Sequence, residues 1–355
     1  MTPLHDIICQ QIRRFGPISI ADYMTLCLLH PEHGYYMRGD PFGATGDFIT
    51  APEISQMFGE MLGVAIATAW QDQGRPPAFV LGELGPGRGT LMADVLRVVA
   101  NVPGFARAAE IWLVEASPAL QNTQRETLQG QQVNWVRNIA DLPDKPLFLL
   151  ANEFFDALPV RQYIRAATGW QEQMIGLHQD RLAFGPSAPI PVEALQDLTE
   201  KPIGAVVETC AAAQALAGEI SRKIAVNGGM FLTLDYGGWG SNGDTFQAVA
   251  RHVKCDPLAS PGMADLTAHV DFAALARAAT GISVTEMVPQ GVFLERLGIT
   301  ARAQALAQSL RGQALENHIA AHRRLTHPDE MGSLFKALAF HPADSPPPPG
   351  FSHDP

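Results

Sequence analysis

A glycine turn is the first place in the chain where chemistry could occur. The segment Gly85-Pro86-Gly87-Arg88-Gly89 follows the apolar run 79–84 and precedes an amphipathic stretch that begins near Thr90. A strand, a glycine turn and a helix in this order bring backbone N–H groups against a bound cofactor. The G-x-G-x-G spacing differs from the G-x-G-x-x-G of dinucleotide binders. It is more typical of a turn that holds the amino-acid part of S-adenosylmethionine (SAM). Arg88 could contact the cofactor carboxylate or only cap the turn.

Carboxylates stand at the ends of three expected strands, where an open α/β sheet binds its ligands. They are Glu83, which we assign to the cofactor site, Glu115 and Glu153. Glu115 follows the turn at close to the roughly 20-residue offset of the ribose-binding acid in nucleotide folds. We therefore predict that it holds the ribose hydroxyls of an adenosyl group; the alternative is a surface acid that caps the next helix. Asp141 is predicted to lie beside the adenine, or else to be a turn aspartate.

A second polar cluster, Asn152-Glu153-Phe154-Phe155-Asp156, combines two carboxylates and an amide with two aromatic rings. An arginine guanidinium would fit there, because Glu153 could pair with it and Phe154 or Phe155 could stack on its face. A guanidinium holds its protons strongly, so chemistry on its nitrogen needs a carboxylate. Glu153 is the predicted catalytic group, with Asp156 or Glu208 as a second acid, and Asn152 is assigned to the cofactor. The alternative is a helix N-cap with core phenylalanines.

Other polar residues are candidates for substrate contact or for a lid over the site. The segment 35–53 is rich in glycine and could close over a ligand, although an ordinary connecting loop is the alternative. His318 and His322 have the spacing of helical metal ligands, but the adjacent glutamate and a third ligand are missing, so we predict no metal site. The substrate and lid candidates are Asp47, Thr50, Phe154, Asp235, Tyr236, Asp265 and His269.

The elements that position these residues follow from the hydrophobic pattern. Alternation of strands and helices from residue 79 predicts an α/β fold with a mostly parallel sheet. The polar–apolar alternation over 161–184 predicts an inserted antiparallel β-hairpin. We expect helices over 3–15, from Ser19 to Leu29, over 53–73 and over 206–226, and strands over 79–84, 111–115, 147–153 and 230–238. We expect an N-terminal helical cap over 1–75, a core over 76–340 with an insertion at about 160–200 and a helical segment over 271–323, and a disordered proline-rich tail over 341–355.

Composition limits the class of protein. The chain has 355 residues and a formal net charge of -11, which argues against broad binding of nucleic acid or anionic membranes and leaves room for a basic protein partner. It has no apolar run of the roughly 18 residues that span a bilayer. The four cysteines form no CxxC pair, which suits a reducing compartment. The first residues lack the basic start and apolar centre of a signal peptide, so we expect a cytoplasmic protein.

Longer blocks of sequence resemble a known family. The chain is similar to the MidA-type SAM-dependent methyltransferases, the family that includes the mitochondrial complex I assembly methyltransferase. The matching blocks, in the family's order, are PEHGYYMRGDPFGATGDFITAPEISQMFGEMLG, LGELGPGRGTLMADVLR, VEASPALQNTQ, ANEFFDALPVRQY, LTLDYGG, PGMADLTAHVDF and HPDEMGSLFKALAF. Several long blocks that agree together are more specific than one glycine turn.

The resemblance implies a Rossmann-like methyltransferase core and SAM as the cofactor. It places Gly85, Gly87 and Gly89 in the SAM turn, Glu115 on the ribose and Asn152-Glu153 next to the methyl group. The implied activity is symmetric dimethylation of an arginine in a subunit of respiratory complex I during assembly. Two alternatives stay open: methylation of a small molecule, and a SAM-binding assembly chaperone without turnover.

Overall fold

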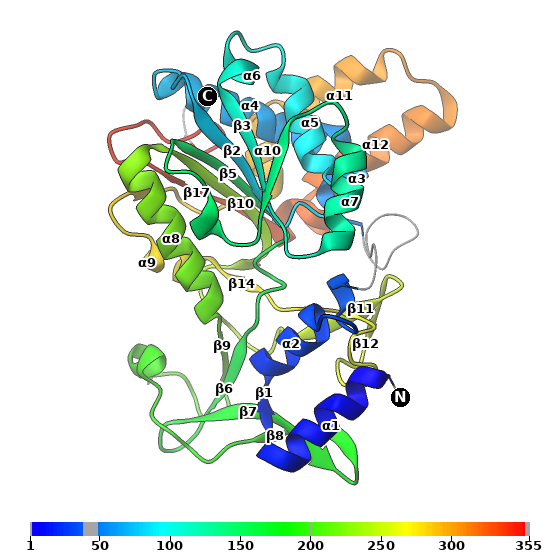
Figure 1. The fold of residues 1–355 in the computed structure, drawn as a ribbon, viewed down its shortest axis with the longest axis vertical. Coiled ribbons are helices and arrows are strands. Elements are labelled where there is room, and N and C mark those ends of the chain that lie inside the picture. The colour runs from blue at the N-terminus through cyan, green and yellow to red at the C-terminus, as the bar shows by residue number, and fades with distance from the viewer. Residues whose placement is uncertain (1, 38–48, 199, 352–355) are drawn as a thin grey trace. The chain divides into compact units, whose positions relative to one another are not determined.

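The computed structural model describes residues 2–37, 49–198 and 200–351. Contacts between Cα atoms divide the chain into two compact units, each made of separate stretches of sequence (Figure 1). Unit 1 comprises Met1–Phe48, Asp156–Gln214 and Gly240–Asp271, and unit 2 comprises Ile49–Phe155, Ala215–Trp239 and Phe272–Pro355. This division falls near residue 48, before the boundary at 75 that we predicted for the N-terminal cap, and it groups the first helices with the inserted strands.

Unit 2 is built on the predicted, mostly parallel sheet. Its strand order is β15-β17-β10-β5-β2-β3-β4, and Figure 1 shows the central strands side by side. The strands from β10 to β4 are parallel, whereas β17 is antiparallel to β10. Every residue of β2 and β5 is buried, as expected for strands covered on both faces. The strands are β2 (Phe79–Leu84), β3 (Ala109–Val114), β4 (Val133–Val136), β5 (Leu147–Asn152), β10 (Gly229–Gly238), β15 (Ser283–Val284), β16 (Val288–Pro289) and β17 (Phe335–His341).

Aromatic rings pack the core of unit 2. The Phe79 ring lies 4.9 Å from the Phe105 ring and 5.2 Å from the Phe148 ring, both edge to face, a favourable arrangement for ring quadrupoles. Gly59 allows helices α4 and α5 to approach closely, because a Cβ at this position would lie 2.5 Å from the Asp94 Cβ. The helices include α4 (Gln56–Asp72), α5 (Thr90–Val99), α6 (Phe105–Ala108), α7 (Pro118–Thr127), α8 (Ala211–Asn227), α9 (Phe272–Ala278), α10 (Gln290–Arg296), α11 (Ile299–Ala307) and α12 (Gly312–Thr326).

Unit 1 joins two N-terminal helices to two small antiparallel sheets, one of five strands and one of three. Helix α1 (Pro3–Phe15) ends at Gly16, and α2 (Ile20–Leu29) begins with the predicted cap, in which Ser19 Oγ accepts from the Asp22 N–H at 3.0 Å. The predicted insertion consists of β6 (Arg161–Arg165), β7 (Trp170–His178) and β8 (Arg181–Pro186), in sheet order β1-β7-β6-β9 with β8 on β7. The remaining strands are β1 (Ile18–Ser19), β9 (Val206–Thr209), β11 (Gln247–Ala250), β12 (Val253–Cys255), β13 (Asp265–Thr267) and β14 (Val270–Asp271).

Three local predictions differ from the structure. The helix expected over 53–73 is broken at Ser55, whose extended backbone separates α3 (Ala51–Ile54) from α4 and whose side chain caps Met57. The helix expected over 206–226 begins instead at Ala211, after strand β9. The tail is packed as far as the structure describes it: Phe351 is 6% exposed and its ring lies 5.1 Å from that of Phe293.

Across its described ranges, the chain has no helix that is long and apolar enough to cross a membrane.

Candidate active site

The glycine turn has the strand–turn–helix geometry that its sequence predicts. Gly85, Gly87 and Gly89 have φ angles of 56°, 52° and 83°. These values lie in the left-handed region, which residues with a Cβ rarely adopt. A Cβ at Gly85 would lie 2.7 Å from the Phe154 Cδ2. Gly89 is the N-cap residue of α5. The turn therefore needs glycine for its backbone conformation and, at Gly85, also for the close approach of a ring.

Glu115 is held beside this turn by a glutamine that the sequence analysis missed. Gln124 Nε2 donates to the Gly87 carbonyl at 2.8 Å and to Glu115 Oε2 at 3.1 Å, and Gln124 Oε1 accepts from Trp135 Nε1 at 2.8 Å. Gln124 is fully buried. The sequence signal for Gln124 is a polar residue on the buried face of α7, and that face is known only from the structure.

Glu115 itself is buried, not a surface acid. It is 8% exposed, and its Oε1 accepts from the Ser117 N–H at 2.7 Å. Burial raises the pKa of the Glu115 carboxyl, and the N–H of Ser117 and the amide of Gln124 oppose that shift. Ser117, not Glu115, is the N-cap of α7, where its side chain accepts from the Leu120 N–H. The position therefore suits the ribose role predicted for it, which stays a prediction.

Glu83 is more deeply buried than Glu115. It is 3% exposed on β2, and its Oε2 has no hydrogen-bond partner among the residues that the structure describes. Burial raises the pKa of Glu83 to about 8, the Met92 N–H lowers it, and the charge of Glu115 raises it further. A buried polar atom of this kind fits a site that completes its bonding with a ligand.

We expect the stability of the unliganded protein to fall with rising pH through Glu83. The native carboxyl has a pKa of about 8, whereas the unfolded one is near 4.3. Between these values the native state binds the proton and the unfolded state does not, so the free energy of unfolding decreases as pH rises and levels off above about pH 8. Glu83→Gln should flatten this slope when melting temperature is followed from about pH 5 to 9. Glu110→Gln, at a half-exposed acid, serves as control; equal slopes in all three proteins would contradict the assignment.

The turn after β5, residues 153–155, is called the acceptor turn after the role predicted for Glu153, and it begins at Glu153 with a strained backbone. The φ of Glu153 is +50°, and a bulky residue in this region persists only where the surroundings enforce it, commonly at functional sites. The Glu153 N–H donates to the Leu234 carbonyl at 2.9 Å. Glu153 Oε1 accepts from the Ala51 N–H at 2.9 Å and from Asn152 Nδ2 at 3.0 Å. The structure thus fixes both the backbone and the carboxylate of the predicted catalytic residue.

Asp235 holds the rest of the acceptor turn in place. It is fully buried, and its Oδ2 accepts from the N–H groups of Phe154 at 3.1 Å and Phe155 at 2.9 Å. These bonds place the Phe154 ring against Gly85. In this stretch of the described chain no helix begins at Asn152 or Asp156, so the alternative of a helix N-cap is wrong, while Phe155 does belong to the core at 3% exposure.

Four of the predicted site residues that the structure describes belong to unit 1. Glu208 lies on β9, and its carboxylate accepts from Gln162 Nε2 at 2.9 Å, from the N–H groups of Thr245 and Phe246 at 3.1 Å each, and from the Thr245 hydroxyl. Four donors already occupy the oxygens of this carboxylate, which favours a structural role for it over proton transfer. His269 is exposed, and its N–H donates to Thr245 Oγ1 at 2.8 Å.

The other two unit 1 residues, Asp156 and Asp265, gather around Tyr36. The Tyr36 hydroxyl donates to Asp265 Oδ1 at 2.8 Å. Burial raises the Tyr36 pKa well above its ordinary value, and the charges of Asp265 and Asp156 add to the shift. The Asp156 carbonyl accepts from the Ala268 N–H at 2.9 Å. Buried acids beside a tyrosine form a polar cluster within this unit.

The remaining candidates lie at the margins or outside the described residues. Asp141 is exposed in a short 3-10 helix (Ile139–Asp141), with Asn138 Nδ2 3.4 Å from its Oδ2. The Tyr236 ring packs edge to face on Phe335 at 5.5 Å. Thr50 is the N-cap residue of α3. Asp47 and residues 38–48 of the predicted lid lie outside the described residues.

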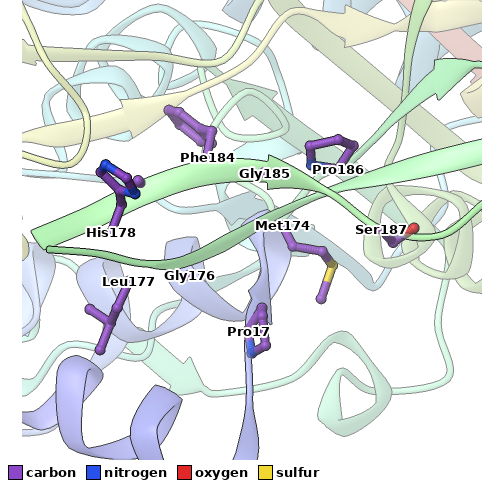
Figure 2. A pocket seen from close by; sticks show the side chains of 10 residues that line it. Pro17, Met174, Gly176, Leu177, His178, Phe184, Gly185, Pro186 and Ser187 are labelled. Carbon is purple, nitrogen blue, oxygen red and sulfur yellow. The ribbon is translucent and has the colours of Figure 1, made fainter. Parts of the chain in front are cut away.

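Among the described residues no group of three or more His, Cys, Asp or Glu side chains could hold a metal ion. A hollow of about 410 Å³ lies on unit 1, between Pro17 and the β7–β8 hairpin (Figure 2). Met174, Leu177 and Phe184 line it, and it contains none of the predicted site residues.

The glycine turn, the acid after the next strand and the parallel sheet together define a Rossmann-like enzyme with an adenosyl cofactor site. Comparison with known proteins makes this specific: the chain belongs to the family described as "Putative S-adenosyl-L-methionine-dependent methyltransferase", whose model matches residues 61–289. The protein is thus a SAM-dependent methyltransferase, as its sequence predicts.

Individual relatives agree along nearly the whole chain. "Protein arginine methyltransferase NDUFAF7, mitochondrial" of Homo sapiens is 37% identical over 377 residues, which are 96% of this chain and 84% of the relative. The Danio rerio protein of the same name is 38% identical over 93% of this chain and 84% of its own length. A crystal structure of a "likely methyl transferase" from Burkholderia thailandensis, bound to S-adenosylhomocysteine, has a TM-score of 0.85 and 28% identity and covers 99% of this chain and 94% of its own.

The residues present fit SAM. The glycines leave a cradle at the strand end that a Cβ would fill, and the orphaned oxygen of Glu83 and the carboxylate of Glu115 lie beside it. When bound, SAM supplies a methyl group activated by its sulfonium sulfur. Gly85, Gly87 and Gly89 would hold its amino-acid part, and Glu115 its ribose.

Proposed function

We propose that this enzyme methylates an arginine of a protein. The observation that carries the proposal is the fixed carboxylate of Glu153, held in a strained backbone at the end of β5 and joined to the glycine turn through the contact between Phe154 and Gly85. The names of the relatives, which are protein arginine methyltransferases at 35–38% identity, support it.

The residues of the acceptor turn suit a guanidinium. Glu153 supplies the negative charge that a guanidinium pairs with in a defined geometry. Phe154, which is only partly buried, offers an aromatic face for stacking. A guanidinium nitrogen must lose a proton when it is methylated, and a carboxylate held by two donors can orient the group and accept that proton. Asp235 keeps the turn in the conformation that this requires.

We further propose that the acceptor is a subunit of respiratory complex I, that its arginine is symmetrically dimethylated, and that the modification supports assembly of the complex. The family resemblance is the basis for this substrate. Action in the cytoplasm stays a prediction from the sequence.

The test is transfer of a labelled methyl group. The purified enzyme is incubated with methyl-labelled SAM and complex I subunits from cells that lack this protein, and arginine derivatives are then identified by mass spectrometry. We expect label in symmetric dimethylarginine of one subunit, with no such label in the same subunits from normal cells, where the arginine is already modified. Label only in a small molecule would overturn the protein substrate, and SAM binding without any transfer would favour the chaperone.

A further inference from the structure

A four-residue helix, α3, contacts both functional turns of unit 2. At its start, the Ala51 N–H donates to Glu153 Oε1 at 2.9 Å. Two residues later, Glu53 Oε1 accepts from the Thr90 hydroxyl at 2.5 Å, and Glu53 Oε2 lies 3.6 Å from Arg88 Nη1. The helix therefore touches the candidate catalytic carboxylate at one end and the glycine turn at the other.

The Glu53 carboxylate lies where a negative charge is favourable. Thr90 is the first residue of α5, and an acid beside a helix N-terminus is stabilised by the helix dipole. The Glu53 side chain is 18% exposed and that of Arg88 39%, so solvent screens their attraction only in part. Glu53 thereby fixes two residues that flank Gly89. Arg88 pairs with Glu53, and the contact predicted between Arg88 and the cofactor carboxylate stays a prediction.

The pairing constrains the glycine turn from outside. The three glycines of the turn lose much conformational freedom when they are ordered, so the turn depends on contacts from neighbouring residues to hold its conformation. From one side Gln124 holds the Gly87 carbonyl; from the other, Glu53 holds Arg88 and Thr90. The same short helix that presents Glu53 presents the Ala51 N–H to Glu153, so a movement of one contact displaces the other.

We propose that Glu53 is a positioning residue: it orders the glycine turn for the methyl donor and, through α3, ties that turn to the orientation of Glu153. The first half rests only on the SAM-dependent activity of the family. The second half rests on the role proposed for Glu153, and the measurements below separate the two.

The test compares Glu53→Gln and Glu53→Ala with the wild-type enzyme. Affinity for S-adenosylhomocysteine is measured by calorimetry. The melting temperature is measured without ligand, and kcat and KM for SAM are measured in the methyl-transfer assay. Glutamine keeps an acceptor for Thr90 but loses the charge, so we expect affinity to fall about threefold for Glu53→Gln and about tenfold or more for Glu53→Ala. Partial rescue by glutamine is a signature of positioning. A fall in kcat for Glu53→Ala beyond its effect on KM reports the link to Glu153.

Two controls keep the result decisive. Glu330→Gln removes an ion pair of unit 2, with Arg323 at 2.9 Å, and should leave affinity and KM unchanged. In the double variant Glu53→Gln/Arg88→Gln, the losses of affinity should be less than multiplicative, because both remove one pairing. A lower melting temperature with affinity and KM within about twofold of wild type would overturn the proposal, as would multiplicative losses in the double variant. Reduced affinity with unchanged kcat would overturn only the link to Glu153.

Discussion

Glu153→Gln is expected to reduce methyl transfer by about 10²- to 10⁴-fold, the range of a positioned general base, while affinity for S-adenosylhomocysteine stays within about twofold. Glutamine has the same shape and can still accept from the Ala51 N–H and from Asn152, which hold Glu153 Oε1 at 2.9 and 3.0 Å. It cannot pair its charge with a guanidinium or take its proton. Transfer is measured in a single turnover with the acceptor subunit, and affinity by calorimetry.

The matched control is Glu110→Gln, at an acid of the same unit that pairs with Lys145 at 2.5 Å near the surface. It should leave both quantities unchanged. Equal losses of transfer and affinity in Glu153→Gln would show that the carboxylate holds the cofactor site together, and the catalytic role would be wrong. The result also separates this residue from Glu53, whose substitution should change affinity first.

The backbone of Glu153 offers a second readout for the same residue. Its φ of +50° costs roughly 1–2 kcal/mol for a residue other than glycine, asparagine or aspartate. Glu153→Asn should therefore unfold at the same or a higher temperature while losing transfer, since a stored strain is relieved as the function is removed. Loss of both stability and transfer would mean that the hydrogen bonds of the Glu153 carboxylate stabilise the fold by more than the strain costs.

Local signals account for what the sequence could predict. The apolar run Phe79–Leu84 is buried as a strand, and the cap at Ser19 and Asp22 starts α2 as expected, because both depend on neighbours within a few residues. The glycine turn was predictable for the same reason. Its backbone conformation requires glycine at fixed positions, so the spacing of the glycines alone indicates the turn.

Contacts between distant segments account for what the sequence could not predict. Gln124 meets Gly87, and Ala51 meets Glu153, across separations of 37 and 102 residues, and no periodicity encodes such pairs. The break at Ser55 was hidden because residues on both sides continue a helical pattern, while the Ser55 side chain caps the new start. Strand β17 was missed because its apolar run lies beside helical segments and is defined only by pairing with β10. The residues that fix the site are therefore the ones that tertiary structure supplies.

Gly85→Ala is expected to lower affinity for S-adenosylhomocysteine by about tenfold or more and to reduce transfer with it, through a clash added to an unfavourable backbone. The new Cβ would stand 2.7 Å from Phe154 Cδ2 at a φ of +56°. Phe154 has little room to retreat, because the N–H groups of Phe154 and Phe155 are bonded to the buried Asp235. Either the glycine turn or the acceptor turn must move, and both belong to the proposed site.

The clash can be separated from the backbone strain within the same unit. Gly74 has a φ of +81° and open space around its missing Cβ, so Gly74→Ala carries the strain alone and should lower the melting temperature without changing affinity. In Gly85→Ala/Phe154→Leu the smaller side chain relieves the clash, and affinity should recover in part although transfer need not. An affinity in the double variant as low as in Gly85→Ala would show that strain in the turn dominates. The contact between Gly85 and Phe154 would then not be what joins the two turns, whereas their connection through α3 rests on other contacts.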